Sequence, residues 1–157
     1  DVCSSDLNII KRNSVYKIHM NAIIIKSRAL LRFDGCSKGN PGKSGAGAAL
    51  YSDNVEIWAD YLYVGSNITN NQAEYAGLIL GLNKALELNI TDLDVEGDSK
   101  LVIQQMNKTY KCNSQKLQIS FKIASDLSSQ FNTITFRHIY RDDNKRADKL
   151  ANMAIVE

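Results

Sequence analysis

The segment ALLRFDGCSKGNPGKSGAGAALYSDNVEIWADYLYV, residues 29–64, predicts three consecutive β-strands. Residues 29–33 form a short apolar run that ends at the turn-forming pair Asp34-Gly35, which is typical of a buried strand. A cluster of turn residues and a hairpin follow, and both are read from glycine, proline, asparagine and alternating apolar residues. The turn covers residues 39–42, and the hairpin consists of strands 45–51 and 55–64 around a loop at 52–54.

Helices and strands alternate after this segment. Apolar residues recur at helical spacing in four places, and short β-branched or alternating stretches mark two further strands. The expected helices run from caps at 69–71 to about 88, through 101–106, over 114–130 and over 142–153, with strands at 93–96 and 133–140. The order β-β-β-α-β-α-α-β-α predicts an α/β fold, in which an antiparallel meander joins parallel strands in one mixed sheet flanked by helices.

Composition indicates a single globular domain and excludes several classes of protein. The chain has 157 residues, 44% of them hydrophobic and 23% charged, and a net charge of +2 that predicts no partner by itself. There is no apolar run of about 18 residues, so we expect no membrane span. Three cysteines, Cys3, Cys36 and Cys112, are too few for a disulfide framework or a zinc site, which favours a reducing, cytoplasmic location.

The first 28 residues differ from the rest of the chain. They are polar and show only a weak apolar pattern, so we expect an N-terminal extension at 1–28 that is partly disordered. Residues 29–157 then form the single domain that carries all the motifs discussed below, and we expect it to be monomeric. The extension contains basic residues without the interleaved aromatic residues of a nucleic-acid-binding platform.

Four acidic residues stand out, although each has an ordinary structural explanation when taken alone. Asp34 fits a turn aspartate, and Asp98, after Gly97, fits a helix N-cap. Glu74 fits a carboxylate that favours a helix N-terminus, and Asp148 fits a solvated position among basic neighbours. No single acid therefore predicts a site.

The four acids together point to metal-assisted chemistry. Carboxylates gathered at one place raise each other's pKa unless a cation neutralises them. Oxygen ligands suit Mg²⁺, which proteins commonly hold with a few carboxylates together with substrate phosphates. Two such ions about 3.5–4 Å apart can activate water and stabilise the leaving oxygen of a phosphodiester. The acids therefore predict metal-assisted phosphoryl hydrolysis.

Four motifs occur in an order that resembles type 1 ribonuclease H, from about residue 29 to the C-terminus. They are Phe33-Asp34-Gly35 with Gly39-Asn40-Pro41-Gly42, Thr69-Asn70-Asn71-Gln72-Ala73-Glu74-Tyr75, Gly97-Asp98-Ser99, and Asn144-Lys145-Arg146-Ala147-Asp148-Lys149-Leu150-Ala151-Asn152. The resemblance implies a ribonuclease H-like fold whose five-stranded sheet has three antiparallel and two parallel strands. It also implies endonucleolytic hydrolysis of the RNA strand of an RNA–DNA hybrid, leaving 3′-hydroxyl and 5′-phosphate ends. The metal ligands carried over are Asp34, Glu74, Asp98 and Asp148, holding two Mg²⁺ ions for which Mn²⁺ can substitute.

Substrate-binding residues carry over from the same resemblance. It places Asn40, Asn70 and Asn71 in the minor groove of the hybrid, where amides can donate to and accept from a ribose 2′-hydroxyl. Helix capping is the alternative role of the paired asparagines. Thr69 corresponds to a position that touches a DNA phosphate, and Ser99 either faces the RNA backbone or caps a helix.

The chain departs from the family pattern beside the last acid. His138 stands ten residues before Asp148, the spacing of a mobile histidine that assists proton transfer or product release in many members. Its neighbours Ile139, Tyr140 and Arg141 indicate a strand end instead of a flexible loop. His138 is therefore either catalytic or structural, and Arg141 is the candidate substitute that contacts phosphate.

A second departure concerns the grip on the hybrid. Many members carry a basic, tryptophan-containing protrusion, whereas residues 104–118 hold three lysines and no tryptophan, so we expect the protrusion to be absent. Trp58 lies in a predicted strand and is expected to pack there. Scattered basic residues would then attract phosphates, and salt would weaken binding. These residues are Lys38, Lys43, Arg137, Arg141, Lys145 and Arg146.

Two other functions fit clustered acids on such a fold. One is a transposase, integrase or structure-selective DNA nuclease, which shares two-metal chemistry and usually lacks the paired asparagines. The other is a nucleic-acid-binding domain that has lost catalysis, or the ribonuclease H portion of a larger polyprotein such as a reverse transcriptase. The presence of all four acids argues against lost catalysis.

Overall fold

The computed structural model describes residues 28–155 of the chain. The N-terminal extension expected at 1–28 therefore lies outside the described residues, apart from Arg28. Within the described part, no helix combines the length and the apolar character needed to cross a membrane.

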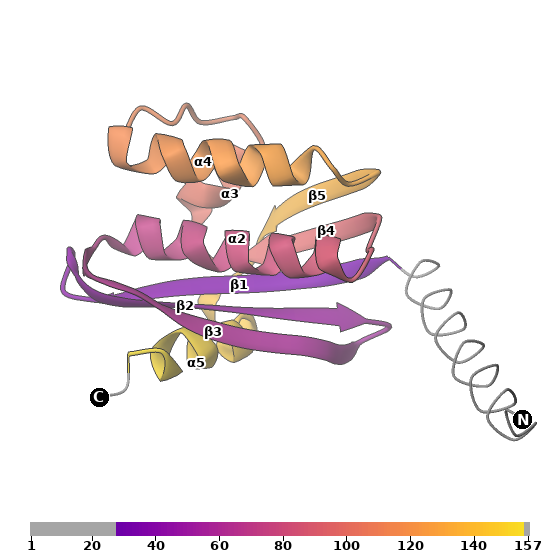
Figure 1. The fold of residues 1–157 in the computed structure, drawn as a ribbon, viewed down its shortest axis with the longest axis horizontal. Coiled ribbons are helices and arrows are strands. Elements are labelled where there is room, and N and C mark those ends of the chain that lie inside the picture. The colour runs from indigo at the N-terminus through magenta and orange to yellow at the C-terminus, as the bar shows by residue number, and fades with distance from the viewer. Residues whose placement is uncertain (1–27, 156–157) are drawn as a thin grey trace, which may run out of the picture.

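The described residues form five strands, four α-helices and one short 3₁₀ helix (Figure 1). The elements follow the predicted order. The strands are β1 (Ala29–Lys38), β2 (Gly42–Ser52), β3 (Val55–Ile68), β4 (Asp92–Gly97) and β5 (Thr133–His138). The helices are α2 (Asn70–Glu87), α3 (Lys100–Met106), α4 (Gln115–Ser128), the 3₁₀ helix η1 (Arg141–Asp143) and α5 (Lys145–Met153).

The five strands make one mixed sheet in the order β3-β2-β1-β4-β5. The pairs β3–β2 and β2–β1 are antiparallel, and the pairs β1–β4 and β4–β5 are parallel. Tight connections suffice for the antiparallel meander, whereas each parallel pair needs a helical crossover, which α2 and the α3–α4 pair provide. The predicted sheet of three antiparallel strands extended by two parallel ones is confirmed.

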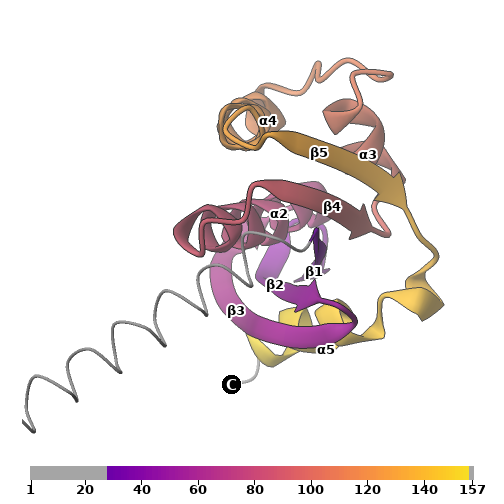
Figure 2. The ribbon, with the colours of Figure 1, turned by 90° about the vertical axis from the view of Figure 1, so that its right-hand side faces the viewer.

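The two faces of the sheet are covered unequally. Helix α2 packs on β1 and β2 with α3 and α4 beside it, and α5 lies against the opposite face of the same strands (Figures 1 and 2). Leu31 and Phe33 point from β1 into the core beneath α2, and both are fully buried. Trp58 packs at the margin of this core, as expected for a strand tryptophan.

The first strand is longer than the sequence predicts. Its ladder with β2 continues to the pair Lys38↔Lys43, so the backbone stays extended beyond the apolar run at 29–33. Asp34 is therefore a residue in the middle of a strand, and the prediction of an Asp34-Gly35 turn is wrong. Pairing with β2 keeps the Asp-Gly pair extended, because the neighbouring strand satisfies its backbone groups.

The C-terminal elements also differ from the prediction. Strand β5 ends at His138 instead of residue 140, and the last helix begins at Lys145 instead of Asp142. Asn144, at φ −116° and ψ 25°, separates η1 from α5 because this backbone conformation lies outside the helical range. The interruption turns the chain so that α5 starts beside β1.

Three glycines bring backbone against backbone around the centre of the sheet. A Cβ on Gly35 would overlap the main chain of Ala73 in α2, and one on Gly77 would lie 2.5 Å from the carbonyl oxygen of Asp34. On the other face, a Cβ on Gly47 would lie 2.6 Å from the backbone nitrogen of Ala151 in α5. Such distances are below normal contact, so only glycine lets α2 and α5 approach β1 and β2 this closely.

On the side of the sheet where α5 lies, this helix contacts β1, β2 and β3 and leaves β4 and β5 uncovered. Charged side chains form a ladder across this uncovered part. Arg32, Glu96 and Arg137 are direct cross-strand neighbours on β1, β4 and β5. The largely buried Glu96 carboxylate accepts hydrogen bonds from both guanidinium groups, with its Oε2 3.2 Å from Nη2 of Arg32. Side chains two residues apart on a strand share a face, so Asp34 follows Arg32 on this face of β1.

Candidate active site

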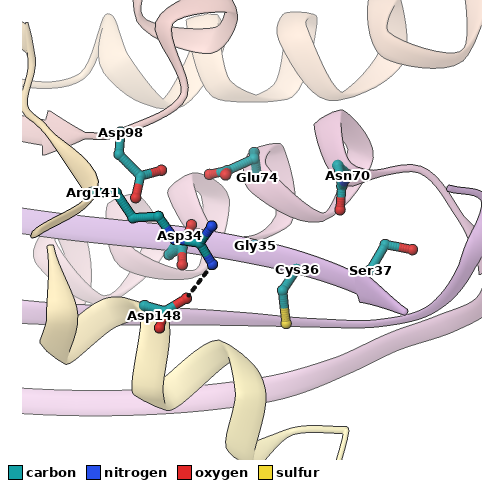
Figure 3. A pocket seen from close by; sticks show the side chains of 9 residues that line it. All are labelled: Asp34, Gly35, Cys36, Ser37, Asn70, Glu74, Asp98, Arg141 and Asp148. Atoms are coloured by element: carbon teal, nitrogen blue, oxygen red, sulfur yellow. Dashed lines mark ion pairs between the residues drawn. The ribbon is translucent and has the colours of Figure 1, made fainter. Parts of the chain in front are cut away.

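Three of the four predicted acids converge at one point, although they come from different elements. Asp34 projects from the middle of β1, Glu74 from the second turn of α2, and Asp98 from the bend after β4 (Figure 3). One carboxylate oxygen from each of the three lies within 4.8 Å of the other two. Gly35 makes this approach possible, because its missing side chain admits the α2 backbone that carries Glu74.

The fourth acid, Asp148, stands at the edge of the same pocket and outside this three-carboxylate group. It projects from the first turn of α5, and its Oδ1 lies 3.6 Å from Nη2 of Arg141 and 3.3 Å from Nδ2 of Asn152. The pocket has a volume of about 380 Å³ and is open to solvent. Its lining consists of Asp34, Gly35, Cys36, Ser37, Asn70, Glu74, Asp98, Arg141 and Asp148.

Burial and mutual repulsion raise the pKa values of the two innermost acids. Asp34 is only 5% exposed, and desolvation together with the charge of Asp98 raises the pKa of its carboxyl to about 7. Desolvation and the charge of Asp34 raise the pKa of Glu74 well above its usual value. Without a cation, the pair therefore retains protons at pH values where exposed carboxyls have lost them.

The site fits a divalent cation that prefers oxygen ligands. All three convergent donors are carboxylates, and hard cations such as Mg²⁺ bind oxygen ligands. Glu74 is 8% exposed, and its Oε2 is buried without a hydrogen-bond partner among the described residues. A buried carboxylate oxygen without a partner is costly, and a cation held between the acids would remove that cost.

The asparagines predicted to bind substrate lie at the start of α2. Asn70 lines the pocket, and its backbone N–H donates to Oδ1 of Asn40, 3.1 Å away in the β1–β2 turn. Asn71 is adjacent and partly buried. The helix cap is Thr69, which exchanges hydrogen bonds with Gln72 in a capping box. The Asn70 and Asn71 side chains are therefore not the N-cap of α2. The Thr69 side chain is fixed in place by the hydrogen bond that it accepts from the backbone N–H of Gln72.

Ser99 and His138 both lie beside Asp98. The Ser99 hydroxyl accepts a hydrogen bond from the backbone N–H of Val102, 3.3 Å away, so Ser99 caps α3. The Nε2 of His138 lies 3.2 Å from the backbone oxygen of Asp98, and the ring packs edge-on against Tyr140. The His138 side chain lies outside the pocket lining, at the end of β5.

Arg141 is the one basic side chain in the pocket lining. Two of the other basic residues predicted to contact phosphate are instead paired with carboxylates. Arg137 pairs with Glu96, and Arg146 donates two hydrogen bonds to Glu56 at 2.9 and 2.8 Å. These pairs neutralise part of the charge that the sequence suggested for phosphate attraction. Residues 107–114 join α3 to α4 without an intervening helix, in agreement with the missing protrusion.

The sequence left two residues of the pocket lining and one buried residue behind it unassigned. Cys36 and Ser37 line the pocket because β1 continues past Asp34, which the apolar run at 29–33 did not indicate. Asn144 is buried beside β1, and its Nδ2 donates to the carbonyl oxygen of Phe33 at 2.9 Å. Its place in the fourth motif was the only available signal, since a bond across 111 positions leaves no local pattern.

Known proteins resemble the chain over most of the described residues. The profile of a family described as reverse transcriptase-like matches residues 32–154. A bifunctional protein of Mycobacterium tuberculosis is 39% identical over 129 residues, and ribonuclease HI of Halobacterium salinarum is 37% identical over 123 residues. These alignments cover 82% and 78% of this chain, but only 35% and 62% of the two relatives.

Solved structures show the same fold. The N-terminal ribonuclease H domain of the mycobacterial protein has a TM-score of 0.80 at 37% identity, and covers 83% of this chain and 94% of that domain's chain. The structure of LC11 ribonuclease H1 in complex with an RNA/DNA hybrid has a TM-score of 0.77 at 30% identity, covering 82% and 96%. The motifs, the strand order and these comparisons agree: the chain belongs to the ribonuclease H family, whose profile is described as reverse transcriptase-like.

Proposed function

We propose that this chain is an endonuclease that hydrolyses the RNA strand of RNA–DNA hybrids, leaving 3′-hydroxyl and 5′-phosphate ends. The observation that carries the proposal is the convergence of Asp34, Glu74 and Asp98 within 4.8 Å in an open pocket. The matched profile and the named relatives support the same activity. Because the chain spans only 35% and 62% of the lengths of the mycobacterial and halobacterial relatives, the proposal concerns this domain alone.

The cofactor we propose is a pair of Mg²⁺ ions, with Mn²⁺ as a substitute. Asp34 would contact both ions, Glu74 and Asp98 the one on the leaving-group side, and Asp148 the one beside the attacking water. When bound, such ions supply an activated water and stabilise charge on the leaving oxygen. The all-oxygen donor set and the unpartnered Oε2 of Glu74 support this assignment.

Substrate recognition would fall to the amides at the start of α2. Asn70 lies in the pocket lining, within the same cavity as the acids, and Asn40 is tied to its backbone. With Asn71, these side chains can donate to and accept from the 2′-hydroxyls that distinguish RNA from DNA. In this scheme Thr69 and Ser99 cap the two helices that present the binding surface, and their remaining hydrogen-bonding capacity faces the backbone phosphates.

Arg141, in our proposal, contacts the phosphate at the reacting centre. It is 81% exposed and lines the pocket, so it is free to follow a substrate once it leaves Asp148. A planar guanidinium suits bidentate binding of phosphate. His138 lies against the Asp98 backbone and would orient that acid's loop, and an involvement in proton transfer would require the ring to turn into the pocket.

The proposed setting is a reducing, cytoplasmic one with the domain acting as a monomer. Cys36 and Cys112 are free thiols, in agreement with a reducing compartment. Size-exclusion chromatography with light scattering would measure the oligomeric state directly.

Cleavage of end-labelled duplexes tests the function. The wild-type chain should cut an RNA–DNA hybrid with Mg²⁺ present, and Asp98→Asn should reduce that activity by at least about 10²-fold because a ligand of the reacting centre is lost. Asp126→Asn is the matched control, since Asp126 is an exposed acid on α4 that pairs with Lys122 of the same helix. Undiminished cleavage by Asp98→Asn would refute the site.

The same assay separates the alternative functions. Hybrid, duplex DNA and duplex RNA of one sequence are compared under identical conditions. Preference for duplex DNA would favour a structure-selective nuclease or integrase, and binding of hybrid without cleavage would favour a domain that has lost catalysis.

A further inference from the structure

We propose that Asn144 is a positioning residue that holds Asp148 at the metal site by fixing the first turn of α5 to β1. The inference rests on the proposed function, because Asp148 matters to the reaction only if the acids act together. Asn144 itself is 1% exposed and touches neither the pocket nor solvent.

The hydrogen bonds of Asn144 connect the strand of one acid to the helix of another. Its Nδ2 donates to the carbonyl oxygen of Phe33, the residue immediately before Asp34, at 2.9 Å. Its own carbonyl oxygen accepts from the backbone N–H of Asp148 at 3.1 Å. Asp34 and Asp148 are far apart in sequence. They are thus connected through Asn144, by its hydrogen bond to the residue before Asp34 and its hydrogen bond from the backbone of Asp148.

This side chain is not used as an ordinary helix cap. Asn144 occupies the N-cap position of α5, where an asparagine side chain normally accepts from the free N–H groups of the first turn. Here it makes no such bond, and its amide turns toward β1 instead. The first turn of α5 therefore has no side-chain cap from Asn144, and the Asn144 side chain forms a hydrogen bond between the helix and β1 instead.

The orientation of the amide is fixed, and part of it is left unsatisfied. The Phe33 oxygen can only accept, so the NH₂ group must face it and Oδ1 must point away. Oδ1 is buried and has no hydrogen-bond partner among the described residues. An apolar side chain would avoid that unpaired acceptor, so stability alone does not favour asparagine at this position.

The first turn of α5 has contacts of its own with β2 and β3, and the Asn144 bond is what joins it to β1. A Cβ on Gly47 of β2 would lie 2.8 Å from the carbonyl oxygen of Ala147, and Arg146 pairs with Glu56 of β3. The later residues of α5 also rest on β2, where Ala151 meets the backbone at Gly45 and Gly47. Asp148 lies in the first turn, and the exposed Arg141 draws its carboxylate at 3.6 Å. The contacts of Ala147 and Arg146 are with β2 and β3, so without the bond to Phe33 the first turn can pivot on them and carry Asp148 away from β1.

The test compares Asn144→Ala with Asn107→Ala. Asn107, the C-cap residue of α3, makes the same type of bond at the surface, from its Nδ2 to the carbonyl oxygen of Phe136 at 3.1 Å. Two properties are measured for each protein: Mn²⁺ affinity by calorimetric titration of the free chain, and kcat and KM for hybrid cleavage. Thermal unfolding followed by circular dichroism establishes that each variant is folded.

We expect Asn144→Ala to weaken Mn²⁺ binding and lower kcat, each by on the order of 10- to 100-fold, as loss of a group supporting a metal ligand does. KM for the hybrid should stay within about twofold, because Asn144 is buried away from the substrate. Asn107→Ala should match the wild type. Mn²⁺ affinity and kcat of Asn144→Ala within about twofold of wild type would overturn the inference.

A double-mutant cycle distinguishes positioning from general structural damage. If Asn144 acts through Asp148, then Asn144→Ala should have little further effect on Mn²⁺ binding in an Asp148→Asn background. An undiminished effect there would refute the role. Should Asn144→Ala not fold, Asn144→Asp, which keeps the volume and removes the N–H donor, takes its place in the cycle. If the wild-type chain fails to cleave hybrid, the proposed function fails, and the Mn²⁺ titrations still decide the role of Asn144.

Discussion

Replacing Asp34 by asparagine should abolish metal-dependent cleavage and, at the same time, stabilise the metal-free protein at neutral pH. The pKa of Asp34 is about 7 in the folded chain, against 3.8 for the ordinary carboxyl, mainly because the group is desolvated and lies near Asp98. The folded state therefore binds the proton more tightly than the unfolded state does. Raising the pH from about 4 to about 7 favours the unfolded chain, since its exposed carboxyl ionises at no cost.

The size of the effect follows from the two pKa values. Each pKa unit corresponds to about 1.4 kcal/mol, so a shift from 3.8 to about 7 makes the ionised carboxyl cost about 4 kcal/mol above pH 7. Asparagine has nearly the same shape and cannot ionise. We therefore expect Asp34→Asn to be more stable than wild type by up to about 4 kcal/mol at pH 8, with the difference approaching zero near pH 4.

Urea unfolding followed by circular dichroism measures this difference. The experiment is run from pH 4 to pH 8 with a chelator present, and Asp126→Asn serves as a control for loss of an exposed carboxylate. Adding Mg²⁺ should reduce the advantage of Asp34→Asn, because only the wild-type site gains binding free energy. A stability difference that is independent of pH, or a variant less stable than wild type at pH 8, would refute the assignment of the raised pKa to Asp34.

Three further predictions concern the surroundings of the site. Gly35→Ala should destabilise the fold by about 1–3 kcal/mol and weaken Mn²⁺ binding, because the added Cβ pushes Ala73 and the neighbouring Glu74 away from β1; thermal unfolding and metal titration check both. Tyr75→Phe should cost about 1–3 kcal/mol in urea unfolding, since the buried Gln105 Oε1 loses its 2.6 Å bond, while kcat stays unchanged; a lower kcat would contradict a purely structural role. Chelation should abolish hybrid cleavage and added Mg²⁺ or Mn²⁺ should restore it, so cleavage that survives chelation would exclude metal dependence.

The sequence predicted the order of the elements well because local signals determine most of them. Alternation and apolar runs identified all five strands, and the Thr69 and Ser99 caps mark helix starts that the structure confirms. The end of β1 was mistaken because an Asp-Gly pair favours a turn, whereas pairing with β2 keeps it extended. Cross-strand pairing is a tertiary effect that a local pattern does not contain.

In the candidate site, too, local motifs were predictable and contacts between distant residues were not. Motif context identified the four acids, of which three converge and Asp148 stands apart with Arg141. No local pattern indicates that Arg137 and Arg146 are paired with carboxylates, since Glu96 and Glu56 lie far from them along the chain. Asn144 was equally hidden, because its role depends on the approach of α5 to β1.

The glycine contacts at residues 35, 47 and 77 determine which parts of this molecule can vary. Because main chain meets main chain at these points, the spacing of α2, β1, β2 and α5 is set by the size of backbone atoms and not by the volume of side chains. Substitutions among the larger core residues can then change the packing density without moving the helices that carry the acids. Substitutions in the hydrophobic core therefore leave the relative positions of the metal-binding acids unchanged. A homologue could replace much of that core and keep the same site.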